Sequence, residues 1–246
     1  MNDKPLSGKR ALVTGASGAL GGAIARRLAA DGASLLLHGH SRPELTWALA
    51  DEIRAAGGDA ESFAFDIADD SLTAAAVALM LKGGAVQIIV NNAGIHDDAV
   101  FPGMKHAQWH RVIDLSLHGF FRVTQPLLLP MLRTRWGRIL NLSSVTALAG
   151  NRGQVNYAAA KGALNSATKA LALEVASRGV TVNAIAPGLI DSPMAASAFD
   201  AEAVKRLVPV QRAGTPEEVA ALAGFLASAE AGYITGQVIS INGGLY

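Results

Sequence analysis

Short apolar segments alternate with longer helix-like segments along the whole of this chain. The apolar segments have three or four residues each and predict strands at 11–13, 35–37, 62–65, 88–90, 139–142, 180–182 and 238–241. The segments between them predict helices at 20–31, 43–56, 72–82, 109–134, 154–177 and 216–227. Such alternation predicts a parallel sheet with right-handed crossovers. We therefore expect an α/β fold, a doubly wound parallel sheet of about seven strands with helices on both faces.

Two of the predicted helices carry signals tied to single positions. In the last one, Thr215 can serve as the N-cap, with Pro216 at the first helical position and Glu218 at the third. In the fourth, Pro126 and Pro130 each lack a backbone N–H group. They predict that this helix is kinked or ends early.

The composition is that of a globular protein with a large core. Half of the 246 residues are hydrophobic and only 17% are charged. No uninterrupted apolar run reaches the roughly 18 residues of a membrane-spanning helix, so we expect the apolar side chains in strands that are buried on both faces. No shift in composition, internal repeat or low-complexity segment divides the chain. We expect a single domain over residues 1–246.

Charge and cysteine content exclude several classes of function. A net charge of +1 with mixed signs argues against a nucleic-acid surface. The absence of cysteine excludes disulfides and thiolate metal sites. His106 and His110 lie four residues apart without a clear third ligand, so we expect a solvated helix face and no metal. The polar N-terminal segment has no signal-peptide character, and we expect a soluble, cytoplasmic protein with no membrane partner.

A glycine-rich segment, residues 14–22, joins the first predicted strand to the first predicted helix. Such a turn lets backbone N–H groups and the helix N-terminus meet a phosphate. Glycine clusters also form ordinary tight turns, but the position of this one favours a dinucleotide site on a Rossmann-type sheet. No Lys-Ser or Lys-Thr follows, which excludes a nucleoside-triphosphate loop, and Ala19 in place of glycine excludes a nucleophile elbow. The residues expected at the cofactor are Gly15, Ser17, Gly18, Ala19, Leu20 and Gly21.

The end of the second predicted strand bears on the choice of cofactor. An NAD site usually has an acidic residue there, which binds the ribose 2′-hydroxyl, and none is present between 35 and 43. Ser41 and Arg42, together with His40, can instead receive a 2′-phosphate. A solvated loop is the alternative. The segment favours NADP(H).

Tyr157 and Lys161 lie four residues apart in an alanine-rich segment that predicts helix, so their side chains share a face. A nearby cation favours phenolate, and we expect Lys161 to lower the pKa of Tyr157 and make it a usable proton donor. Ser144 follows the fifth predicted strand, where its hydroxyl can help to hold a carbonyl oxygen. Taken alone, the Tyr–Lys pair is better explained as a buried ring beside a solvated lysine, and its weight comes from the other motifs.

Together these motifs resemble the short-chain dehydrogenase/reductase family in its single-domain form, over essentially the whole chain. The resemblance covers the glycine-rich turn, the segments 91–94, 187–188 and 190–192, and the trio Ser144, Tyr157 and Lys161. It implies that Ser144 hydrogen-bonds the substrate carbonyl, that Tyr157 protonates it, and that Lys161 also binds the nicotinamide ribose. Further cofactor residues implied by the resemblance are Asp66, Ile67, Asn92, Ala93, Gly94, Tyr157, Lys161, Pro187, Gly188, Ile190 and Ser192.

Residues 150–157, 234–238 and 242–244 are more narrowly similar to 3-oxoacyl-acyl-carrier-protein reductases. That resemblance implies reduction of an acyl-carrier-protein-bound 3-oxoacyl thioester by NADPH in a homotetramer. It places Asn151 and Gln154 at the substrate, and Arg135 and Arg178 where the acidic carrier protein docks. Ordinary helix-end arginines are the alternative for the last two. A reductase of free small ketones, alcohols or sugars, and a non-catalytic cofactor-binding partner protein, are the rival functions.

The chain departs from the family pattern at two positions. Ala19 stands where the family has the middle glycine of the phosphate loop, and its methyl group either crowds the pyrophosphate or only shifts the loop. Ser116 stands where the family has a catalytic asparagine that orders a water on the proton path to the lysine. A serine hydroxyl also binds water but has fewer groups with which to fix it. We expect slower proton supply and an active enzyme, with Ser116 in the role of the asparagine.

Overall fold

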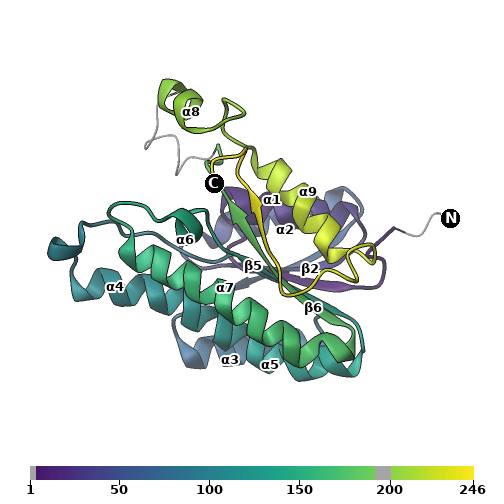
Figure 1. The fold of residues 1–246 in the computed structure, drawn as a ribbon. Coiled ribbons are helices and arrows are strands. Elements are labelled where there is room, and N and C mark those ends of the chain that lie inside the picture. Colours follow the sequence, from purple (N-terminus) through teal and green to yellow (C-terminus); the bar gives the residue numbers. More distant parts are fainter. Residues whose placement is uncertain (1–3, 192–200) are drawn as a thin grey trace.

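The computed structural model describes residues 4–191 and 201–246, and its centre is one parallel sheet of seven strands (Figure 1). The strand order is β3-β2-β1-β4-β5-β6-β7. The strands are β1 (Arg10–Val13), β2 (Ser34–Gly39), β3 (Asp59–Ala64), β4 (Ile88–Asn91), β5 (Gly137–Leu142), β6 (Val180–Pro187) and β7 (Val238–Ile241). The predicted doubly wound Rossmann-type fold is confirmed.

Helices cover both faces of the sheet. On one face lie α1 (Ala19–Ala30), α2 (Pro43–Ala55) and α9 (Pro216–Ala227); on the other lie α3 (Asp70–Lys82), α4 (His106–Ile113), α5 (Gly119–Arg133) and α7 (Val155–Val175). Shorter helices are α6 (Thr146–Ala149) and α8 (Ala201–Leu207), with the single turns η1 (Phe101–Gly103) and η3 (Ala176–Arg178). No helix in the described part of the chain has the length and apolar character needed to cross a membrane.

The central strands are buried along almost their whole length because both of their faces are covered. In β1, Ala11 and Val13 pack in the core under α1 and α9, whereas Leu12 packs in the core under α3 and α5. Successive side chains of a strand point to opposite faces, so one strand serves both cores. The edge strand β3 differs: it begins at Asp59, three residues before the predicted start, and has an exposed side. An edge strand does not need a continuous apolar run, which is why the sequence pattern missed its first half.

The helix predicted at 109–134 has three parts. It starts at His106 as α4, widens into the π-helix η2 (Asp114–His118), and continues as α5 to Arg133. Of the two effects expected from Pro126 and Pro130, an early end is wrong, because both lie inside α5. Val123, Leu127 and Met131 are fully buried on its inner face, and this packing outweighs the missing hydrogen bonds. The π-helix gave no sequence signal.

A capping box marks the start of α9. At α9 the predicted capping box is confirmed: the N–H of Glu218 donates to Thr215 Oγ1 (3.3 Å), and the N–H of Thr215 donates to Glu218 Oε2 (2.8 Å).

The strand order sets the position of the site, because it reverses between β1 and β4. In open α/β sheets a crevice forms at this point, at the carboxyl ends of the strands, and ligands bind there.

Candidate active site

The glycine-rich turn after β1 is packed so tightly that side chains cannot enter it. Gly15 has φ of +66°, and a Cβ atom there would lie 3.0 Å from Asn92 Nδ2. A Cβ atom on Gly21 would lie 2.3 Å from the Gly15 carbonyl oxygen. This close approach brings the first turn of α1, whose N–H groups lack intrahelical acceptors, up to the end of β1. The turn therefore fits the pyrophosphate of a dinucleotide.

The substitution at position 19 leaves this geometry intact. Ala19 is the first residue of α1, its side chain is exposed, and it is not among the described residues with positive φ. A helical residue tolerates a methyl group without backbone strain. The sequence left two consequences open, crowding of the pyrophosphate or a shift of the loop. The structure needs no shift of the turn to accommodate the methyl group.

The loop after β4 braces the same turn. The Asn92 side chain donates to the carbonyl oxygens of Thr14 (2.9 Å) and Gly15 (3.1 Å). Thr14 Oγ1 accepts from the N–H groups of Asn92 and Ala93, each at 3.0 Å. Asn92 was expected at the cofactor, which stays a prediction; in the structure its side chain holds the turn in place.

Sequence reasoning missed His38, which lies under this turn near the end of β2. Its Nδ1 accepts from the N–H of Gly15 (3.2 Å), and its Nε2 pairs with the Phe65 carbonyl oxygen (2.9 Å). Burial is the main cause that lowers the pKa of His38 to about 4, so the ring is neutral. A lone histidine in an otherwise apolar strand was the available signal.

The residues expected to choose the cofactor lie together at the carboxyl ends of β2 and β3. His40, Ser41 and Arg42 are exposed, so their side chains are free to meet a ligand. His40 Nδ1 lies 3.8 Å from Asp66 Oδ1, which also accepts from the N–H of Ala68 at 2.9 Å. Ile67, the neighbour of Asp66, is buried against α5, where a Cβ on Gly119 would meet it at 2.6 Å.

The structure brings Ser144, Tyr157 and Lys161 together beside the end of β5. Lys161 is buried, and its Nζ donates to the Leu142 carbonyl oxygen at 2.6 Å. The same Nζ lies 5.7 Å from the centre of the Tyr157 ring. Burial lowers the pKa of Lys161 to about 8. The alternative prediction, a solvated lysine, is wrong, because this ammonium group is inside the protein.

The expected lowering of the Tyr157 pKa by Lys161 is wrong for this structure. Burial of the half-buried phenol raises the pKa of Tyr157, a hydrogen bond with Ser144 lowers it, and the charge of Asp98 raises it. Desolvation thus exceeds the pull toward phenolate. A tyrosine with a raised pKa keeps its proton at neutral pH, and the neighbouring Ser144 can accept or donate a hydrogen bond at the same oxygen.

Ser116 lies in the π-helix and faces the same corner. Its buried Oγ has no hydrogen-bond partner among the described residues. A Cβ on Gly94 would lie 3.2 Å from Lys161 Nζ and 3.4 Å from Ser116 Oγ, so only Gly94 separates the two groups. Ser116, Thr14 and Asn91 border a cavity of about 10 Å³, close to the space that one water molecule needs. The role expected for Ser116 stays a prediction, and its place in a π-helix is one that recurs at functional sites.

Asn151 and Gln154, both expected at the substrate, are tied into a polar rim. Gln154 Oε1 accepts from Asn151 Nδ2 (3.0 Å) and from Thr146 Oγ1 (3.2 Å). Gln154 Nε2 donates to Asp98 Oδ2 (2.9 Å), and His96 Nδ1 lies 3.3 Å from Asp98 Oδ1. Asp98, which was not predicted as a site residue, is thereby held where its charge acts on Tyr157.

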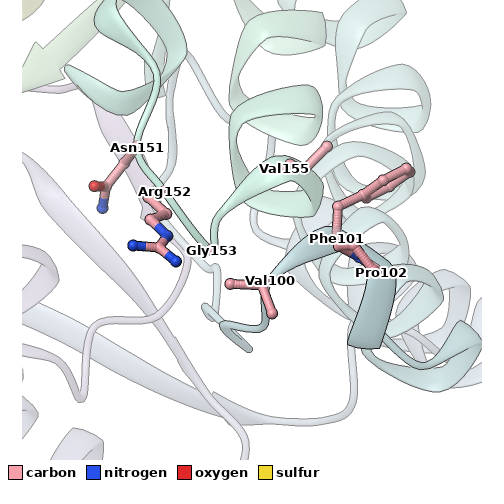
Figure 2. Close-up of a pocket in the computed structure, with 7 residues that line it drawn as sticks. All are labelled: Val100, Phe101, Pro102, Asn151, Arg152, Gly153 and Val155. Carbon is pink, nitrogen blue, oxygen red and sulfur yellow. The ribbon is translucent and has the colours of Figure 1, made fainter.

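An open pocket of about 520 Å³ lies next to this rim (Figure 2). Figure 2 shows the side chains of Phe101 and Val155 close to each other on one side, and Asn151 and Arg152 on the loop at the other. Val100, Phe101 and Val155 are exposed, and the lining is largely apolar. An apolar ligand therefore has a surface on which to pack beside the rim.

The segment after β6 closes the crevice on the side of β7. The N–H of Gly188 donates to the Ile241 carbonyl (3.0 Å), and the N–H of Val145 donates to the Pro187 carbonyl (2.9 Å). Ile190 is buried and bridges to Gly214. Ser192, expected at the cofactor, lies outside the described residues.

Arg135 and Arg178 are both exposed and lie near each other, just before β5 and β6 begin. A Cβ on Gly179 would meet the Arg135 carbonyl oxygen at 2.3 Å, which shows how close the two segments are. The trio lies at the other end of these strands, and a six-residue strand spans about 20 Å. Within one chain, the two arginines are thus on the opposite edge of the sheet from Tyr157.

Two histidines considered for a metal site lie with stacked rings, their centroids 6.4 Å apart, on α4. Over residues 4–191 and 201–246, no three or more histidine or carboxylate side chains are grouped as a metal site requires. His106 and His110 therefore gain no third ligand from the described residues.

Comparison with known proteins gives the same family from several directions. A family model described as enoyl-(acyl carrier protein) reductase matches residues 15–246. Nodulation protein G of a Rhizobium species is 44% identical over 243 residues, which cover 98% of each chain. The 3-oxoacyl-acyl-carrier-protein reductase FabG of Aggregatibacter actinomycetemcomitans is 43% identical over 240 residues, 95% of this chain and 98% of that protein.

Among solved structures, a protein of Agrobacterium tumefaciens provisionally named a gluconate dehydrogenase has a TM-score of 0.94 at 35% identity, over 100% of this chain and 98% of the other. The relatives thus differ in the substrates that their names give, but they share the fold and nearly the full length. The chain belongs to the short-chain dehydrogenase/reductase family, a family of oxidoreductases that bind a nicotinamide cofactor.

Proposed function

We propose that this protein reduces 3-oxoacyl thioesters, carried on acyl carrier protein, to 3-hydroxyacyl thioesters with NADPH. The observation that carries the proposal is the buried Lys161 beside Tyr157 and Ser144, opposite a turn that fits a dinucleotide. FabG-named relatives, 41–43% identical over nearly the full length, support the 3-oxoacyl substrate.

The residues divide the work of carbonyl reduction. The nicotinamide supplies the hydride when bound. Ser144 donates a hydrogen bond to the carbonyl oxygen, where negative charge develops. Tyr157 gives its proton to that oxygen, and its raised pKa keeps the proton in place until then. Lys161, held by the Leu142 carbonyl, presents its ammonium to the tyrosine side of the corner, and Ser116, which lies across Gly94 from this ammonium, supplies protons to it.

NADPH is the proposed cofactor because of the charges at the end of β2. His40, Ser41 and Arg42 are exposed there, and no acidic residue lies between 35 and 43. Arg42 can pair with a 2′-phosphate, which an arginine binds more strongly than a hydroxyl group. Asp66 lies close to His40 and remains available on the adenine side.

The apolar pocket in Figure 2 supports an acyl substrate over a sugar. Phe101, Val100 and Val155 offer packing to a hydrocarbon chain but few hydrogen bonds to hydroxyl groups. The rival function, oxidation or reduction of a free small sugar, ketone or alcohol, is favoured by the name of the Agrobacterium relative. A non-catalytic partner protein is disfavoured by the intact trio.

The deciding experiment follows loss of reduced-nicotinamide absorbance with the purified protein. Three substrates are compared, each with NADPH and with NADH: the acetoacetyl thioester, the crotonyl thioester and a sugar substrate derived from gluconate. We expect NADPH oxidation with the acetoacetyl thioester, and about a 10³-fold loss of kcat in Tyr157→Phe with nearly unchanged NADPH affinity. Turnover of only the crotonyl thioester or only the sugar would refute the proposed substrate, and a near-normal rate in Tyr157→Phe would refute the proposed acid.

The role of the two arginines is tested separately. Changing Arg135 and Arg178 together to Glu should raise KM for an acyl-carrier-protein substrate about tenfold or more, because like charges then face an acidic partner. The KM for the coenzyme A thioester should stay within about twofold, because that substrate does not use the docking surface. If the parent protein and the double variant have equal KM values for the carrier-bound substrate, the arginines serve only as helix-end residues.

We also propose a homotetramer, assembled in part through α5 and α7. Phe121 and Leu129 on α5 are 64% and 59% exposed, and Leu173 on α7 is 86% exposed. Large exposed apolar side chains on neighbouring helices are typical of protein interfaces. Light scattering of the purified chain, compared with Leu173→Glu, measures the assembly directly.

A further inference from the structure

His38 joins two parts of the cofactor site that no other described side chain connects. It lies on β2, between the glycine-rich turn after β1 and the end of β3, and it is only 3% exposed. Its ring stacks at a tilt against Phe65, with the ring centres 4.4 Å apart. The ring therefore has one fixed orientation, and both of its nitrogen atoms have partners.

The partners determine which nitrogen carries the proton. Gly15 can only donate its N–H, so Nδ1 must be the acceptor at 3.2 Å. The Phe65 carbonyl can only accept, so Nε2 carries the hydrogen and donates at 2.9 Å. The titratable groups facing the ring, His40 and Asp66, act on it in opposite directions, and burial decides in favour of the neutral form.

The same residue holds the turn a second time through its main chain. The His38 carbonyl oxygen accepts from the N–H of Ala16 at 2.8 Å. The N–H groups of Gly15 and Ala16 thus both point at His38, so they do not point at a phosphate. The N–H groups that remain for a phosphate lie beyond Ala16 and include those of the first turn of α1. Gly15 bears on their direction, because its carbonyl oxygen accepts from the N–H of Gly18 at 3.1 Å.

We propose that His38 is a positioning residue for cofactor binding: its neutral ring links the Gly15 N–H to the Phe65 carbonyl, and so holds the phosphate-binding turn in register with the strand end that carries Asp66. This role concerns the dinucleotide alone and holds whichever carbonyl compound is the substrate. None of the hydrogen bonds or ring contacts that the structure gives His38 involves a member of the trio.

Three substitutions separate positioning from simple packing. In His38→Asn, the amide oxygen occupies the place of Nδ1 and can still accept from Gly15. In His38→Gln, the longer amide reaches the Phe65 carbonyl but leaves the Gly15 N–H without an acceptor. His38→Leu removes both hydrogen bonds and retains an apolar side chain.

The measurement is the Kd for NADPH, taken from nicotinamide fluorescence without substrate, together with the melting temperature of the free protein. We expect Kd within about twofold of the parent in His38→Asn, and about five- to tenfold weaker in His38→Gln and His38→Leu, since one hydrogen bond orients the turn. The two amide variants each lose one hydrogen bond and should melt at similar temperatures. With a turned-over substrate, KM for NADPH should rise in His38→Gln while kcat stays within about twofold.

Several results would overturn the proposal. Parent-like NADPH affinity in His38→Gln would show that the Gly15 contact is dispensable. Equal weakening in His38→Asn and His38→Gln, in step with their melting temperatures, would show a packing role only. If His38→Leu does not fold, the comparison of the two amides still decides. Nitrogen NMR of the free protein gives an independent reading: the Nε2–H form should persist at neutral pH and down toward pH 4, and protonation near pH 6.5 would contradict the geometry.

Discussion

The phosphate-binding turn and the catalytic corner are built in opposite ways, although they face each other across one crevice. In the turn, Thr14, Asn92 and His38 satisfy the polar groups around Gly15 several times over. In the corner, the buried ammonium of Lys161 has a single hydrogen-bond acceptor among the described residues, and the buried Ser116 hydroxyl has none. A saturated network holds one geometry, whereas an unsaturated one leaves groups free to exchange protons.

The corner is therefore costly to fold. Lys161 has an ordinary pKa of 10.5 and a folded pKa of about 8, so the folded protein resists the charge. Its burial carries no charge penalty above pH 10.5, where the amine is neutral in both the folded and the unfolded state, and the penalty grows as the pH falls toward 8. At neutral pH the penalty amounts to about 3 kcal/mol. The turn contains no comparable buried charge, so the comparison predicts different responses to mutation in the two regions.

The largest effect is expected from Lys161→Met. Activity should fall by more than about 10²-fold, because the cation beside Tyr157 is gone. The free energy of unfolding at pH 7 should rise by about 1–2 kcal/mol, because an apolar side chain replaces a buried charge. Urea unfolding at pH 7 and pH 10 measures this change in the free energy of unfolding, and the gain should be smaller at pH 10. A clear loss of stability would show that the corner is not strained by Lys161.

Gly94→Ala tests the spacing between Lys161 and Ser116. The added Cβ would lie 3.2 Å from Lys161 Nζ, so the ammonium must move, and we expect kcat to fall about tenfold. Gly162→Ala is the matched control, because it adjoins Lys161 on α7 and a Cβ there has no neighbour within 4 Å. Steady-state rates of the two variants give the answer. Similar rates in both would mean that the contact at Gly94 does not position the lysine.

Ser116→Ala should lower kcat only a few-fold, by slowing proton supply, and should leave stability unchanged or slightly higher, because the lost hydroxyl has no described partner. Thr168→Val is the contrast. Thr168 Oγ1 accepts from Asn141 and donates to the Leu164 carbonyl, so its removal should cost about 1–3 kcal/mol. If Ser116→Ala leaves both turnover and its pH dependence unchanged, Ser116 is not part of the proton path.

The smallest effect on rate is expected from Asp98→Asn. The Asp98 charge raises the pKa of Tyr157, so its removal lowers that pKa. In the reductive direction Tyr157 acts as an acid, and the decline of kcat at alkaline pH should begin at lower pH. Asp98 is exposed, so added salt should reduce the difference. Asp97→Asn removes the neighbouring carboxylate and should leave the profile in place; a shift in both variants would point to a general change in net charge.

The repeating pattern of apolar strands was sufficient to predict the sheet and the long helices that cover it, whereas the trio was predicted from helix spacing and from the family resemblance. Errors fell where the pattern carries no information. The edge strand β3 begins with the polar Asp59, and the π-helix around Ser116 has no distinct composition. The direction of the Tyr157 pKa was mispredicted because helix spacing reports only that Lys161 is near, and not how much water is excluded from the phenol.

By itself, the sequence determined which residues share a strand or a helix, because side-chain periodicity is local. It thereby determined that Tyr157 and Lys161 lie on one face and that a dinucleotide turn follows β1. Only the tertiary structure decided that Lys161 is buried, that Gln154 and Asn92 brace their neighbours, and that His38 takes the N–H of Gly15. Each of these depends on which groups from distant segments meet and exclude water, and burial of that kind arises only when the whole sheet is assembled.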